Sequence, residues 1–116
     1  MNLESFRDHC LKKNGVTEEF PFGLDTLVFK VNGKMFALTN IESFESINLK
    51  SLPEDVVQLR EQFPAVQPGY HMNKKHWNTV SMDGSIADRL VKEWIDKSYE
   101  LVAKTPVSRV KLKKSK

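Results

Sequence analysis

The stretch TLVFKVNGKMFALT, residues 26–39, decides the fold class. Two largely apolar segments, 26–31 and 34–39, flank the dipeptide Asn32-Gly33. A two-residue type I′ turn needs positive φ at both central positions, which Asn and Gly adopt readily. The stretch therefore predicts a β-hairpin. A further segment, 46–50, alternates apolar and polar residues and extends the hairpin to a three-stranded antiparallel meander.

Helical patterns precede and follow this meander in the sequence. Near the N-terminus, Asn2 is a suitable N-cap, and it is followed by apolar residues at helical spacing, namely Leu3, Phe6, Cys10 and Leu11. Cys10 lies on the apolar face, so we expect a core side chain rather than a reactive thiol. After the meander, Pro53 opens a second helix and Pro64 ends it. Residues 18–23 are expected to form a loop.

The last helix has the longest apolar stripe of the sequence. Ser85 is the expected N-cap, with Asp88 as the acid of a capping box. Trp94 lies on the stripe and is expected in the core; the stripe consists of Ala87, Leu90, Val91, Trp94, Ile95, Leu101 and Val102. A strand is also expected from Trp77 to Met82. The order α-βββ-α-ββ-α predicts an α+β fold with an antiparallel sheet and helices packed on one face.

Length and charge indicate one domain, residues 1–106, followed by a basic and mobile tail, residues 107–116. The chain has 116 residues, with 18 Lys and Arg against 15 Asp and Glu. The tail holds five of the cations and no acid, so 13 cations face 15 acids in the rest. The domain is therefore slightly acidic, which is atypical of a globally basic nucleic-acid binder.

The cysteine content and the lack of targeting segments favour a cytoplasmic protein, which we expect to be a monomer. The single cysteine excludes an internal disulfide. No apolar run reaches the roughly 20 residues of a membrane span, and no signal peptide is recognisable. We expect no membrane association and no cofactor.

The most unusual chemistry lies in PGYHMNKKHWNTV, residues 68–80. Two of the three histidines, one of the two tryptophans and two adjacent lysines occur within it. Hydrogen-bond donors, cations and aromatic rings therefore meet in one loop and the strand that follows. A ligand is expected here if the chain binds one.

This stretch resembles the signature of the MmcQ/YjbR family of small bacterial proteins, and the resemblance extends over nearly the whole chain. The family is similar in fold to CyaY, the bacterial frataxin, and has been described as a double-wing DNA-binding fold. The resemblance implies a CyaY-like fold and a role in binding DNA. The residues that it implicates are Tyr70, His71, Asn73, Lys74, Lys75, His76 and Trp77.

Several interpretations of these residues stay open. Lysines could bind phosphates while Tyr70 or Trp77 stacks on bases, and the basic tail could add to the attraction. The same stretch could instead be a folding element that ties its loop to the sheet. A small-ligand or protein-interaction module is a further alternative, with Phe20 and Phe22 as candidate anchors.

Metal and catalytic sites are not expected. His71 and His76 have no nearby Cys or acid to complete a ligand set, and no nucleophile with a base and an acid partner is recognisable. We therefore predict a non-enzymatic domain without catalytic or metal-binding residues. We also expect both lysines, Lys74 and Lys75, to be exposed, and at least one of the two histidines to be partly buried and hydrogen-bonded.

Overall fold

The computed structural model describes residues 1–104. The tail 107–116 and the expected domain boundary at residue 106 lie outside the described residues. The elements are α1 (Leu3–Leu11), β1 (Thr17–Glu19), β2 (Thr26–Val31), β3 (Lys34–Asn40), β4 (Ser46–Lys50), α2 (Pro53–Gln62), β5 (Val66–Pro68), β6 (Trp77–Ser81) and α3 (Asp88–Ala103).

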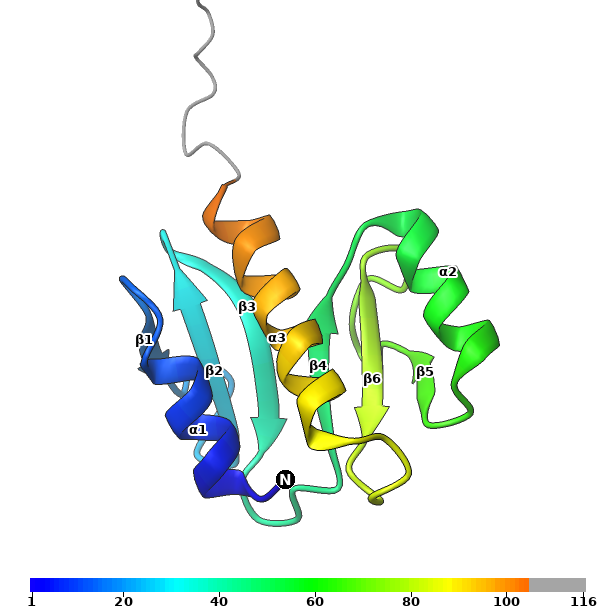
Figure 1. Cartoon of the computed structure of the whole chain (residues 1–116). Helices are drawn as coiled ribbons and strands as arrows, with labels where there is room; N and C mark the ends of the chain where they lie inside the picture. Colours follow the sequence, from blue (N-terminus) through cyan, green and yellow to red (C-terminus); the bar gives the residue numbers. More distant parts are fainter. Residues whose placement is uncertain (105–116) are drawn as a thin grey trace, which may run out of the picture.

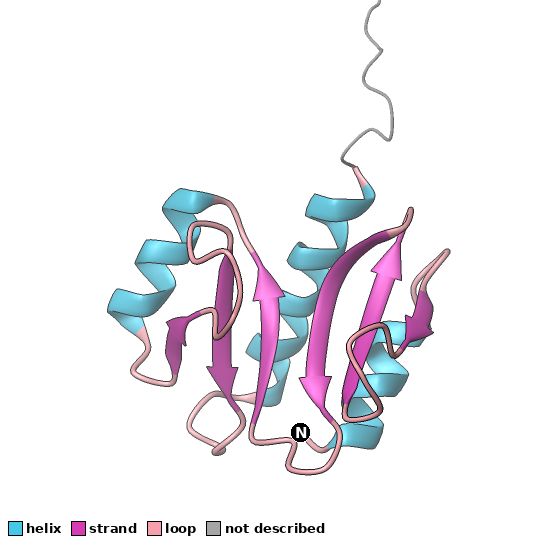
Figure 2. Cartoon of the chain, turned by 180° about the vertical axis from the view of Figure 1, so that it is seen from behind, coloured by secondary structure: helices cyan, strands magenta, loops and turns pink. Residues whose placement is uncertain are grey.

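These elements form an α+β fold with one six-stranded antiparallel sheet. The strand order is β1-β2-β3-β4-β6-β5, and the three helices lie on one face of the sheet (Figure 1). Seen from behind, the other face carries no helix (Figure 2). The predicted fold class is therefore confirmed. No helix among residues 1–104 is long and apolar enough to cross a membrane.

The predicted hairpin is present, with positive φ at Asn32 (54°) and Gly33 (76°). One prediction next to it is wrong, because residues 17–19 form the edge strand β1 instead of the start of a loop. Glu18 pairs with Phe29, and Glu19 with Val28. A strand of three residues is too short to show an alternating pattern, so only its pairing with β2 reveals it.

The core lies between the sheet and the helices. Phe6 packs edge-on against Phe29, with ring centroids 5.5 Å apart. Cys10 is fully buried here, as predicted, and this burial raises the pKa of its thiol. Trp94 is 7% exposed and packs edge-on against Phe63, which confirms its expected place in the core.

The opposite face of the sheet carries a second, smaller apolar cluster. It consists of the buried Val28, Leu38 and Trp77, with Met35 and Met72 packed against them. Met72 comes from the loop between β5 and β6. That loop therefore takes part in covering the face that the helices leave open.

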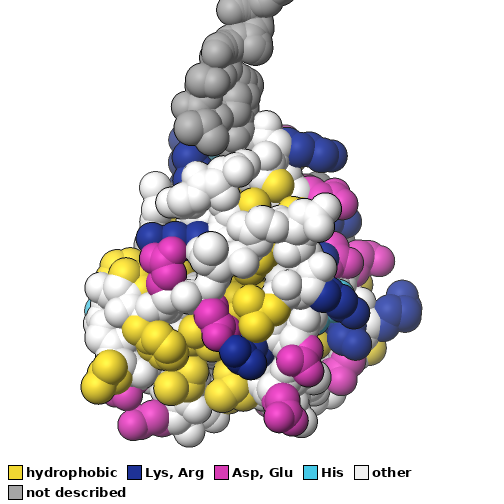
Figure 3. All heavy atoms as spheres, turned by 90° about the vertical axis from the view of Figure 1, so that its left-hand side faces the viewer, with side chains coloured by type: hydrophobic (Ala, Val, Ile, Leu, Met, Phe, Trp, Pro, Cys, Tyr) yellow, Lys and Arg dark blue, Asp and Glu magenta, His cyan; other side chains and the backbone are white. Residues whose placement is uncertain are grey.

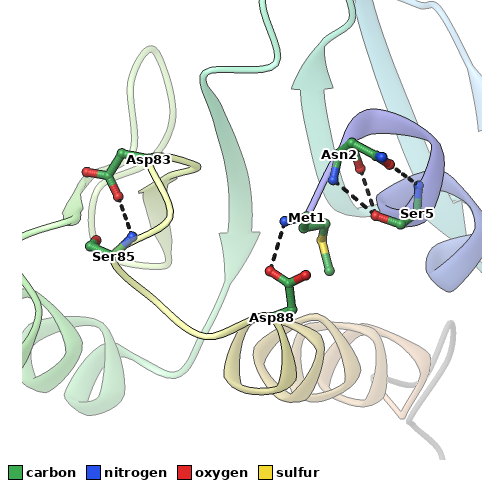
Figure 4. A network of polar contacts seen from close by, with 6 residues as sticks. All are labelled: Met1, Asn2, Ser5, Asp83, Ser85 and Asp88. Atoms are coloured by element: carbon green, nitrogen blue, oxygen red, sulfur yellow. Dashed lines mark hydrogen bonds and ion pairs between the residues drawn. The ribbon is translucent and has the colours of Figure 1, made fainter.

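The helix starts confirm one predicted cap and correct another. Asn2 caps α1 through a capping box with Ser5, as shown in Figure 4. Ser85 does not cap α3, which begins at Asp88 after Ala87 and has no side-chain cap. The backbone amide of Ser85 instead donates to Asp83 Oδ1, 2.9 Å away. The acid in the first turn of α3 is also in use, because Asp88 Oδ1 lies 2.8 Å from the terminal ammonium of Met1.

Candidate nucleic-acid interface

The candidate site is the loop of residues 69–76, the signature loop, which joins β5 to β6. Its first residue makes a close approach to the strand. A methyl group on Gly69 would lie 2.8 Å from Cβ of Trp77 and 3.0 Å from Cβ of Met72. Real Cβ atoms do not come so near to each other, so the loop packs against β6 only with glycine at this position.

Arg60 of α2 fixes the end of the loop where β6 begins. Its Nε donates to Oδ1 of Asn78 at 2.7 Å, and its Nη2 donates to the carbonyl oxygens of Lys74 and, at 3.2 Å, Trp77. Asn78 is 2% exposed and donates its own amide to the carbonyl of Val56. The guanidinium of Arg60, with its planar set of donors, therefore connects α2, the loop and the start of β6.

Polar side chains within the loop also hold its shape. Nζ of Lys74 donates to the carbonyl of Gly69 at 2.9 Å. Oδ1 of Asn73 accepts from the amide of Lys75 at 2.9 Å, and its carbonyl accepts from the amide of Trp77 at 3.0 Å. Lys74 and Asn73, two of the residues that the resemblance implicates, therefore have intramolecular partners.

The start of the loop is tied to the sheet through a hydroxyl group. The amide of Tyr70 donates to Oγ1 of Thr79 at 2.9 Å, and this hydroxyl donates to Oδ1 of Asn48 on β4. The Tyr70 backbone is therefore anchored, although its side chain is 70% exposed.

The outer surface of the loop presents two aromatic rings. The centroids of the Tyr70 and His71 rings are 4.0 Å apart, and His71 is exposed. The backbone of His71 has φ of 58°, in the left-handed region that few residues other than glycine adopt. Lys75, four residues after His71, is also exposed, and within the described residues no side-chain contact holds its ammonium.

The seven residues that the family resemblance implicates comprise five exposed residues, the half-buried His76 and the buried Trp77. Tyr70, His71, Asn73 and Lys75 are exposed, and so is the residue Lys74 apart from its bound ammonium. Trp77 is 6% exposed and belongs to the cluster on the open face of the sheet. The expected exposure of both lysines is therefore confirmed.

The expectation for the histidines is only half right. His76 is half-buried, but its hydrogen bonds come from the backbone: its amide donates to Asn73 and its carbonyl accepts from Ser51. Neither His71 nor His76 makes a side-chain hydrogen bond within the described part of the chain. Replacing His71 would therefore leave no polar group without a partner.

Two observations away from the signature loop bear on the alternative functions. Within residues 1–104, no group of three His, Cys, Asp or Glu side chains is placed to hold a metal ion. At the opposite edge of the sheet, just after β1, Phe20, Phe22 and Leu24 are 45%, 64% and 85% exposed. Figure 3 looks onto the β1 edge and shows hydrophobic side chains gathered on the lower part of that face. The two phenylalanines proposed as protein anchors are therefore accessible.

Sequence reasoning missed Arg60, whose guanidinium donates three hydrogen bonds to the loop and to the start of β6. It lies 14 residues before Lys74, on a helix whose pattern indicates only an apolar face. A lone arginine beside its helix's apolar stripe carries no local signal of which distant groups it will contact. The strand itself is easier to recognise from sequence: Trp77 and Val80 point to opposite sides of the sheet, as alternation along a strand requires.

Comparison with known proteins identifies relatives over most of the chain. The family model described as YjbR matches residues 11–101. The uncharacterized protein YbdF of Escherichia coli O157:H7 is 40% identical over 84 residues, which are 72% of this chain and 69% of that protein. The uncharacterized protein YjbR of Escherichia coli K12 is 32% identical over 101 residues, 86% of each chain.

Solved structures show the same fold. A crystal structure of a Deinococcus radiodurans protein superposes with a TM-score of 0.87 at 38% identity, covering 93% of this chain and 83% of that one. A crystal structure of a Pseudomonas syringae protein superposes with a TM-score of 0.76 at 32% identity, covering 88% and 99%. The chain belongs to the YjbR family.

Proposed function

We propose that this protein is a non-enzymatic binding domain that contacts single-stranded nucleic acid through the outer surface of the signature loop. The observation that carries the proposal is the exposed pair of rings, Tyr70 and His71, on a loop whose backbone is fixed to the sheet and to α2. A rigid, exposed aromatic pair offers a stacking surface without a large ordering cost on binding.

Single strands fit this surface better than a duplex does. Bases can stack on protein rings only where they are free of their neighbours, and such stacking contributes about 1–3 kcal/mol per base. The phosphate contacts available are few. Lys75 is free, whereas Lys74 would have to leave the carbonyl of Gly69. With 13 cations against 15 acids before residue 107, the domain itself gives little general attraction.

The protein-interaction alternative also has support from specific observations. Phe20, Phe22 and Leu24 form an exposed apolar group, and a groove opens between α2 and α3. Exposed apolar groups of this kind occur where proteins meet partners. These features lie away from the signature loop, so the two functions do not compete for the same residues.

Fluorescence anisotropy of a labelled 12-nucleotide oligo-dT tests the proposal, with a duplex of the same length for comparison. We expect the full chain to bind the single strand more tightly at low salt. Tyr70→Ala with His71→Gly should weaken this binding about tenfold, since up to two stacking contacts are lost. Glycine at position 71 keeps the positive φ without strain.

The matched control is Phe22→Ala, which removes an exposed aromatic side chain from another loop. It should leave the affinity unchanged. Equal losses for the control and the double variant, or stronger binding of the duplex, would contradict the proposal.

A further inference from the structure

A groove of about 750 Å³ lies between α2 and α3, on the helix-bearing face of the sheet. It exists because α2 packs on β5 and β6 whereas α3 packs on β2, β3 and β4. The two helices therefore stand apart over the middle of the sheet (Figure 1). The end of β4, at Lys50 and Ser51, contributes to the lining of the groove. The signature loop is on the other face.

The walls of the groove repeat every seven residues. Leu52 and Leu59 line it on the side of α2, and Trp94 and Leu101 line it on the side of α3. Leu52 is the N-cap residue just before α2, and Leu59 lies within the helix. Seven residues are close to two helical turns, so Trp94 and Leu101 lie along one side of α3. This is the interval at which apolar side chains recur along helices that pack side by side.

Polar side chains follow the same interval beside the apolar ones. Asp55 and Gln62 accompany the leucines of α2, and Lys97 and Lys104 accompany Trp94 and Leu101 on α3. An apolar seam flanked by charged positions is the pattern that helices use to select a helical partner and its orientation. A small molecule would not require a lining that repeats over two turns on both walls.

The size of the groove agrees with a helix. An α-helix with its side chains is a cylinder about 10 Å across that rises about 5.4 Å per turn, so one turn occupies about 400 Å³. The groove volume of about 750 Å³ therefore corresponds to about two turns, the same length as the seven-residue repeat.

The charges at the rim lack partners. The described residues form five ion pairs, and none of them includes Asp55, Lys97 or Glu100. Charges of both signs beside an apolar seam are complementary to a helix that also carries both signs. Because three lysines and two acids line the groove, the complementary helix has more acids than bases.

We propose that this groove binds an amphipathic, net acidic α-helix of a partner protein, with apolar side chains at i, i+3 or i+4, and i+7. The protein's own residues 107–116 are a poor occupant by charge, because their five cations and no acid would face the lysines of the groove. Leu59 and Leu101 would contact the apolar side of the bound helix, and Lys97 would face its acids.

A synthetic 15-residue helical peptide tests the proposal. It carries leucines at i, i+3 and i+7, glutamates beside them and one lysine, and a scrambled peptide of the same composition is its control. Binding to the full-length protein is followed by NMR chemical shifts of the backbone amides. We expect the shifts to concentrate at residues 52–62 and 94–104, with little effect of the scrambled peptide.

Two matched variants identify the contact. Lys97→Glu changes a rim residue, and Lys92→Glu makes the same change at an exposed position of α3 outside the groove. Lys97→Glu should weaken peptide binding about fivefold to tenfold, because an attraction becomes a repulsion. Lys92→Glu should leave it unchanged. A peptide with lysine in place of the facing glutamate should regain affinity for the Lys97→Glu protein.

Three results would overturn the proposal. The first is equal binding of the scrambled peptide, or shifts outside the groove. The second is a concentration-dependent shift of the groove residues without peptide, together with a dimer in sedimentation, which would assign the groove to a second copy of the chain. The third is a shift of the groove residues on deletion of 107–116, which would assign it to the chain's own C-terminus.

Discussion

Arg60→Ala is the substitution that most directly tests how the signature loop is held. The variant removes the donor to Oδ1 of Asn78, a side chain that is 2% exposed. A buried acceptor without a donor costs about 1–3 kcal/mol. The carbonyl of Trp77 keeps its bond from the amide of Gly69, and the carbonyl of Lys74 lies at an exposed position where water can replace the guanidinium.

With the lost packing of the arginine stem, we expect the free energy of unfolding to fall by about 2–4 kcal/mol. For a domain of this size, each kcal/mol lowers the Tm by about 4 °C, so the Tm should fall by about 8–16 °C. Arg60→Lys should fall in between, because a single ammonium cannot reach all three acceptors.

Thermal and urea unfolding, followed by circular dichroism, measure the effect. The matched control is Arg89→Ala on α3, an exposed arginine whose loss should change stability by less than about 0.5 kcal/mol. An Arg60→Ala protein that melts within about 2 °C of the wild type would refute the reasoning, because three hydrogen bonds to one buried and two backbone acceptors would then contribute almost nothing.

Three further substitutions test the core, the loop and the ion pair between α1 and α3. Trp94→Ala should cost about 3–5 kcal/mol in urea unfolding, because it leaves a cavity beside Phe63; a variant as stable as the wild type would place the residue outside the core. Gly69→Ala should cost more than about 1 kcal/mol, since its methyl group would overlap Trp77, and an unchanged Tm would show that the loop yields freely. Burial opposes ionisation of Asp96, but hydrogen bonds from Lys13 and His9 outweigh it and lower the pKa of the carboxyl. The stability that this gives is present above about pH 4 and is lost as the pH falls through the lower folded-state pKa, so Asp96→Asn should flatten the acid side of the curve of stability against pH; an unchanged curve would speak against the ion pair.

Local chemistry predicted much of the fold. The type I′ turn at Asn32-Gly33 follows from the positive φ that two adjacent positions require. The long stripe of α3 follows from repeated helical spacing, and its buried residues match the expectation at Val91, Trp94 and Ile95. Such features depend on near neighbours in sequence, so a single chain suffices to recognise them.

Features that depend on distant parts of the chain were not predictable. Strand β1 is defined by its pairing with β2. Ser85 matches the sequence pattern of an N-cap, but the segment around Asp83 forms a separate turn. Helix α3 therefore begins only at Asp88. The contacts of Arg60 and the groove between α2 and α3 arise only when helices and strands are assembled.

A salt titration of oligo-dT binding tests most directly whether the signature loop binds nucleic acid or only stabilises the fold. It compares the wild type, Lys75→Ala and a chain that lacks residues 107–116. Each phosphate contact on a single strand contributes about 0.7 to the slope of log affinity against log salt. We expect Lys75→Ala to reduce the slope by about 0.7 without changing the Tm, and removal of the five tail cations to reduce it further. No binding of the wild type at low salt, or the same slope for the wild type and Lys75→Ala, would contradict the nucleic-acid role of the loop.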